Sequence, residues 1–116
     1  MENAVKEKSF RFALRIVKLC KFLREEKHET VMSKQLLRCG TSIGANTAES
    51  RFAQSRPDFI AKLSIALKEA AETDYWLRLL YEAKYLTQEQ FASIIRDCDE
   101  LECLLASIVK TLKTNS

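Results

Sequence analysis

The chain contains only two glycines and one proline among its 116 residues. A β-rich fold reverses direction many times, and its turns draw on these two residue types. Their scarcity therefore favours a few long helices joined by short loops. A chain of this length also fits one domain, since domains most often contain about 100–150 residues. We expect residues 1–116 to form a single all-α domain.

Apolar residues recur at helical spacing in four segments. The predicted helices cover approximately residues 9–24, 30–52, 56–83 and 88–112. Ser55 and Pro57 suit the N-cap and the first turn of the third helix. Thr87 and Gln90 have the spacing of a capping box at the start of the fourth. Because short connections usually join antiparallel neighbours, the sequence predicts an antiparallel up-down-up-down four-helix bundle.

The second predicted helix carries both glycines, Gly40 and Gly44, four residues apart on one face. Glycine inside a helix costs about 0.5–1 kcal/mol relative to alanine. Two of them on one face indicate that another helix crosses closely there. They do not form a phosphate-binding loop, because the lysine and hydroxyl residue of that motif do not follow them.

The first predicted helix has more apolar surface than one bundle core requires. Wound at about 100° per residue, its apolar side chains fill an arc of roughly 220°, whereas a surface helix needs a stripe of about 100° or somewhat more. These side chains are Phe10, Phe12, Ala13, Leu14, Ile16, Val17, Leu19, Cys20 and Leu23. The surplus predicts contact with another protein chain, and a second copy of this chain is the nearest candidate.

The net charge of +3 is too small to indicate nucleic-acid binding, but its distribution is uneven. Residues 1–56 contain 12 basic and 6 acidic residues, a balance of +6, whereas residues 57–116 contain 7 and 10, a balance of −3. The candidate nucleic-acid-binding residues are Lys8, Arg11, Arg15, Lys18 and Arg38. The first four lie along one helix face with no acidic residue between them, and such a stripe contacts phosphates without sequence selectivity. The alternative, that the stripe is only the solvated face, stays open.

A second candidate site is polar and lies on the second and third predicted helices. Its residues are Asn46, Glu49, Glu69 and Glu72. Glu69 and Glu72 flank an apolar stripe that includes Trp76, and a buried carboxylate must be paired or hydrogen-bonded. A polar cluster of this kind could fix helix register or a subunit contact. The alternative is that each of these side chains is solvated.

No pattern of catalytic or metal-binding residues is recognisable. The only histidine, His28, falls in the first predicted loop, where it is a poor base for a nucleophile and does not lie on a helix, as the Glu-x-x-His motif of di-metal sites requires. The four cysteines form no CxxC pair, and each falls in an apolar helical stretch; they are Cys20, Cys39, Cys98 and Cys103. We expect reduced, structural thiols, no metal, no cofactor and no enzymatic activity.

Membrane insertion and export are not expected. No apolar run approaches the ~18 residues that suggest a membrane span. The first residues lack the apolar core of a signal peptide. We therefore expect a cytoplasmic protein.

Five stretches that extend in register over about residues 8–113 show a recurrent pattern. They are residues 9–17, 35–38, 41–49, 58–63 and 65–77. Residues 42–49 are similar to an S-I-x-x-N-I-A-E signature, although Thr47 replaces its usual isoleucine and Ser50 replaces the glycine that often follows. Together the stretches resemble the bacterial 23S rRNA intervening-sequence protein family of four-helix bundles.

The resemblance implies a bundle fold and, in relatives, a ring-shaped homopentamer. Some relatives are encoded within rRNA intervening sequences. Others, the accessory proteins of diversity-generating retroelements, bind nucleic acid and a reverse transcriptase through a basic surface. The resemblance implies no catalytic residues.

These observations predict a non-catalytic homo-oligomer that engages RNA or a ribonucleoprotein, with a reverse transcriptase as a further candidate partner. The alternative is an oligomeric protein scaffold or regulatory adaptor that binds no nucleic acid.

Overall fold

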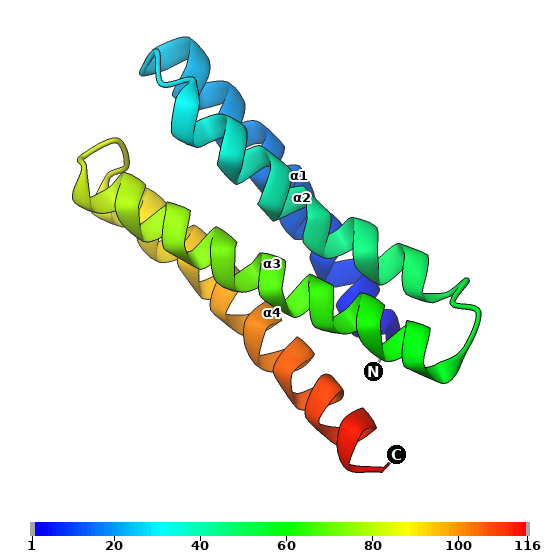
Figure 1. Ribbon diagram of the computed structural model, residues 1–116. Helices are drawn as coiled ribbons and strands as arrows, with labels where there is room; N and C mark the ends of the chain where they lie inside the picture. The colour runs from blue at the N-terminus through cyan, green and yellow to red at the C-terminus, as the bar shows by residue number, and fades with distance from the viewer. Residues whose placement is uncertain (1, 116) are drawn as a thin grey trace.

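Four long helices make up the computed structural model, which describes residues 2–115 (Figure 1). They are α1 (Glu2–Glu26), α2 (Val31–Ser50), α3 (Arg56–Glu82) and α4 (Gln88–Thr114). Successive helices run antiparallel and pack on each other, and α1 also packs on α4, so the order around the bundle follows the chain. The bundle measures 46 × 21 × 20 Å. The predicted all-α up-down-up-down bundle is confirmed.

The helix boundaries differ from the predicted ones mainly at the start of α1. This helix begins at Glu2 rather than near residue 9, and Val5 in its added turns is only 1% exposed. Burial of Val5 extends the core face of Phe12 and Ile16 by two further turns. The second helix ends at Ser50, before Phe52, and α4 continues to Thr114.

The helix starts follow the sequence signals in α3 and α4 but not in α2. The Ser55 side chain accepts a hydrogen bond from the Asp58 backbone N–H, and Thr87 and Gln90 form the complete capping box. At α2 the side chain of Thr30 makes no capping bond. The Glu29 carboxylate accepts the backbone N–H groups of residues 31, 32 and 33 instead, at 3.1, 3.1 and 2.7 Å. A carboxylate suits this position because the helix N-terminus carries partial positive charge.

Both glycines of α2 face α1, which confirms the predicted close crossing. A Cβ added at Gly40 would lie 2.8 Å from both Cγ atoms of Ile16. A Cβ added at Gly44 would lie 3.2 Å from the backbone oxygen of Ser9. The backbones of α1 and α2 therefore approach closely over two turns, and side chains of α1 that do not fit between them point outward.

The four cysteines are free, and three of them are buried. Burial raises the pKa of the Cys20 thiol to about 12, so this thiol stays protonated. Cys103 is exposed, contrary to its expected place in the apolar interior, because it lies on the outer side of α4 between the buried residues Leu101 and Leu105. No helix within residues 2–115 combines the length and apolar character that crossing a membrane requires.

Candidate functional site

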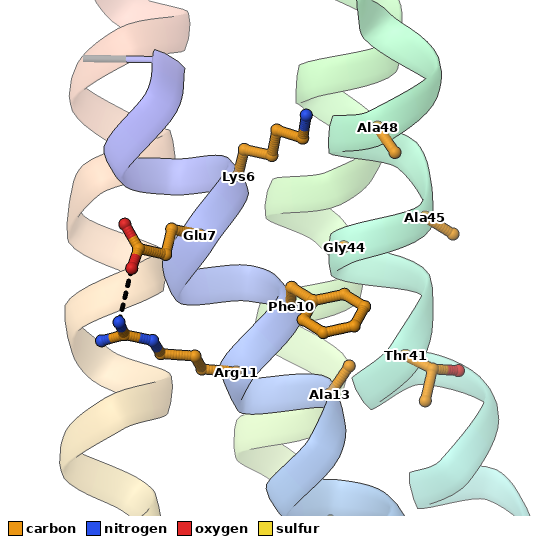
Figure 2. A pocket seen from close by; sticks show the side chains of 9 residues that line it. All are labelled: Lys6, Glu7, Phe10, Arg11, Ala13, Thr41, Gly44, Ala45 and Ala48. Atoms are coloured by element: carbon orange, nitrogen blue, oxygen red, sulfur yellow. Dashed lines mark hydrogen bonds and ion pairs between the residues drawn. The ribbon is translucent and has the colours of Figure 1, made fainter.

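The apolar surplus of α1 lies outside the core. Phe10, Leu14 and Val17 share one side of the helix, and they are 65%, 49% and 46% exposed. Phe10 points toward α2, where Thr41, Ala45 and Ala48 present small side chains (Figure 2). An open groove of about 600 Å³ lies between these two helices.

We call this feature the α1–α2 groove. Its lining residues are Lys6, Glu7, Phe10, Arg11, Ala13, Thr41, Gly44, Ala45 and Ala48. The close approach at Gly44 makes its floor, and small side chains keep it open, so its lining is mainly apolar carbon. The groove is therefore a candidate contact site for another molecule.

Most side chains of the predicted basic stripe on α1 form ion pairs with carboxylates. Lys8 forms an ion pair with Glu100 of α4. Arg15 contacts Asp97 at 2.5 Å and the Ser93 hydroxyl at 2.8 Å, also on α4. These contacts help to fasten α1 to α4.

The other two stripe residues form no ion pair with α4 in the described part of the chain. Arg11 pairs with Glu7 of its own helix, and Lys18 is exposed with no ion pair among the described residues. No acidic residue lies between the stripe residues along their helix face, yet the bundle brings two acids of α4 to it from 82 and 92 positions away in the sequence. Periodicity along one helix gave no signal for these partners.

The fifth basic candidate, Arg38, belongs instead to a polar network between α2 and α3. Its guanidinium contacts the Glu69 carboxylate at 3.1 Å and also pairs with Glu72. Glu72 in turn accepts a hydrogen bond of 3.0 Å from the Trp76 indole N–H. The Arg38 hydrogen bond, with help from Trp76, holds the pKa of Glu72 below its usual range.

The predicted polar cluster is thus only partly brought together. Glu69 and Glu72 meet at Arg38, whereas Glu49 pairs with Lys62 at 3.1 Å. The Asn46 side chain donates to the Ser42 carbonyl of its own helix at 2.9 Å. All four predicted residues lie along the boundary of α2 and α3, but as three separate groups.

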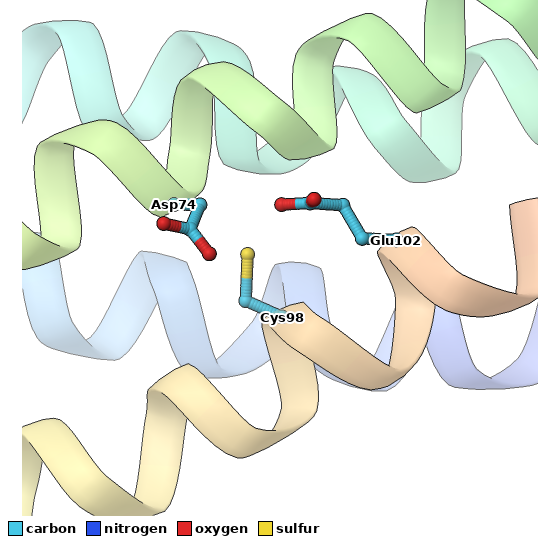
Figure 3. A group of neighbouring side chains, drawn as sticks. All are labelled: Asp74, Cys98 and Glu102. Atoms are coloured by element: carbon cyan, nitrogen blue, oxygen red, sulfur yellow. The ribbon is translucent and has the colours of Figure 1, made fainter. Parts of the chain in front are cut away.

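A further polar group, between α3 and α4, was not predicted from the sequence. Ligand atoms of Asp74, Cys98 and Glu102 lie within 4.8 Å of one another, with all three side chains converging (Figure 3). Burial raises the pKa of Glu102, and the carboxylates of Asp74 and Asp99 raise it further. Burial and Asp74 likewise raise the pKa of Asp99. The residues lie on two helices, so no local spacing could have indicated the group.

The chemistry of this group favours proton sharing. Burial strongly raises the pKa of the Cys98 thiol, so the thiol stays protonated beside the two carboxyl groups. One proton on the carboxyls would relieve their mutual repulsion. We assign no metal site here.

The comparisons with known proteins establish the family. Residues 1–107 match the family described as 23S rRNA-intervening sequence protein. The chain belongs to this family. The resemblance seen in the sequence is therefore confirmed, and the family takes its name from 23S rRNA.

A solved structure shows the same fold in a relative of this family member. The protein, from Bacteroides thetaiotaomicron and of the S23 ribosomal protein family, is described as having unknown function. It is 60% identical, with a TM-score of 0.92, and the match covers 94% of this chain and 97% of that chain. Among curated proteins no match was found.

Proposed function

We propose that this family member is a non-catalytic, homo-oligomeric binding protein of the cytoplasm that engages RNA or a ribonucleoprotein. The observation that carries the proposal is the exposed apolar surface of α1, with Phe10 two-thirds exposed over the α1–α2 groove. A monomer gains nothing from such a surface, whereas self-association would remove it from water.

Three observations support RNA as the further partner. The family is named for 23S rRNA, residues 1–56 carry a balance of +6, and Lys18 is exposed without an ion pair in the described part of the chain. The carboxylates that hold Lys8, Arg11 and Arg15 do not prevent phosphate binding. Exposed ion pairs contribute only about 0–1 kcal/mol each, so a phosphate can displace the carboxylate.

The test is salt-dependent RNA binding. The logarithm of the affinity should fall linearly with the logarithm of salt concentration, with a slope of about 0.7 or 0.9 per phosphate contact depending on strandedness. A double variant, Lys8→Gln with Lys18→Gln, should lower the slope by about 1.4 or 1.8, because it removes two contacts that lie outside the α1–α2 groove. Both side chains are exposed, so the bundle should stay folded.

A matched control removes two positive charges elsewhere. Lys84→Gln with Arg96→Gln changes exposed residues after α3 and on α4 and should leave the slope nearly unchanged. Equal losses in both double variants would indicate a response to net charge alone. Absence of micromolar RNA binding by the unmodified protein at low salt would contradict the RNA part of the proposal.

The second candidate function is a scaffold or adaptor that binds only protein. The ion pairs that occupy Lys8, Arg11 and Arg15 favour it, because they give the basic stripe a structural use within the bundle. A protein that self-associates but binds no RNA at any salt concentration would fit this function.

A further inference from the structure

A second apolar surface lies on α3, at the carboxyl-terminal half of the helix. Tyr75 is 59% exposed and Leu79 is 37% exposed. They border a shallow depression of about 370 Å³, which we call the α3 patch; its lining residues are Ala71, Asp74, Tyr75, Arg78, Leu79 and Glu82. Neither the proposed RNA contact nor the core of the bundle uses this patch.

The shapes of the two surfaces are complementary. Tyr75 and Leu79 are four residues apart, so they form one ridge on the outside of α3. The α1–α2 groove has Gly44 at its floor, the small side chains of Ala45 and Ala48 on its α2 side and Phe10 at its edge. A ridge of two large side chains on one helix fits a groove lined by small residues, as in ordinary helix packing.

Their charges are complementary as well. The groove is rimmed by two cations and one carboxylate, Lys6, Arg11 and Glu7. The patch is rimmed by two carboxylates and one cation, Asp74, Glu82 and Arg78. The net charges of the two rims have opposite signs, which favours contact between groove and patch. Two grooves carry net charges of the same sign, which disfavours contact of one groove with another.

The positions of the two surfaces allow one copy to use both. The groove lies on α1 and α2, whereas the patch lies on α3. We infer that the α1–α2 groove of one copy receives the α3 patch of the next copy. This inference rests on the proposed self-association and specifies its geometry: the contact is head-to-tail, so each copy has one groove and one patch to offer.

The experiment uses two variants of the full chain, Phe10→Arg and Tyr75→Arg, with mass measured by light scattering. Both side chains are more than half exposed, so both variants should keep the helical circular dichroism of the unmodified protein. Each variant alone should be monomeric, because one carries a damaged groove and the other a damaged patch. An equimolar mixture should form a dimer, since the intact patch of Phe10→Arg can enter the intact groove of Tyr75→Arg.

The outcomes separate the two proposals. If the unmodified protein is a monomer at tens of micromolar, self-association itself is wrong. If it is an oligomer but Tyr75→Arg remains an oligomer of the same mass, the α3 patch is not part of the contact and the inference is wrong. A mixture that stays monomeric would also overturn it, because a head-to-tail contact requires the two variants to complement each other.

Discussion

At the scale of single residues, Glu102 shows how burial and neighbouring charge together set a protonation state. It faces Asp74 and Arg78 of α3 and lies near Cys98 and Asp99 of α4. Its pKa is raised, so the folded state favours the protonated carboxyl. The resulting contribution to stability is present below the unfolded pKa and is lost as pH rises through the folded pKa. Ionisation of Glu102 therefore destabilises the bundle.

The destabilising effect of ionised Glu102 leads to a prediction for the variant Glu102→Gln. The free energy of unfolding at pH 7 should rise, because a neutral amide removes the repulsion from Asp74 and Asp99. At acidic pH, where Glu102 becomes protonated, the variant should gain less. Urea unfolding at several pH values measures the difference, and Glu89→Gln, on an exposed carboxylate, is the control. An equal gain at both pH values would contradict the assignment.

At the scale of helices, the contact between α1 and α2 depends on Gly40. A methyl group there would lie 2.8 Å from the Cγ atoms of Ile16, which is fully buried and cannot move aside. Gly40→Ala gains about 0.5–1 kcal/mol of helix propensity but incurs an overpacking cost of about 1–3 kcal/mol. We predict a net loss of about 1 kcal/mol in thermal or urea unfolding. In an Ile16→Ala background the same change should be neutral or stabilising, and a loss there too would contradict the packing explanation.

At the scale of the whole molecule, the exposed apolar surfaces link stability to assembly. A contact made only by folded copies stabilises them by mass action. The melting temperature of the unmodified protein should therefore rise with protein concentration, whereas that of Phe10→Arg should not. Calorimetry over a hundredfold concentration range measures this. If the melting temperatures of the two proteins rise equally with protein concentration, Phe10 takes no part in assembly.

The features that could be predicted from the sequence are those encoded by neighbours along the chain. Ser55 and Thr87 act as caps because their partners lie three residues away, and the exposed surplus on α1 follows from the width of its apolar arc. The capping role of Glu29 was missed because this residue lies before the predicted helix 30–52, yet its carboxylate reaches the free N–H groups of the first turn. The α1 start was missed because Ala4 and Val5 are followed by a run of charged residues.

Helical periodicity and capping are local, so they sufficed to predict the class of fold, the number of helices and the presence of apolar surface beyond one core. Which charged side chains are paired depends instead on contacts between helices. Lys8 and Arg15 meet carboxylates from α4, Arg38 meets Glu69 and Glu72 from α3, and Asp74 meets Glu102. Charges act over a few ångströms of space regardless of separation in sequence, so their pairing depends on the helix rotations that core packing imposes.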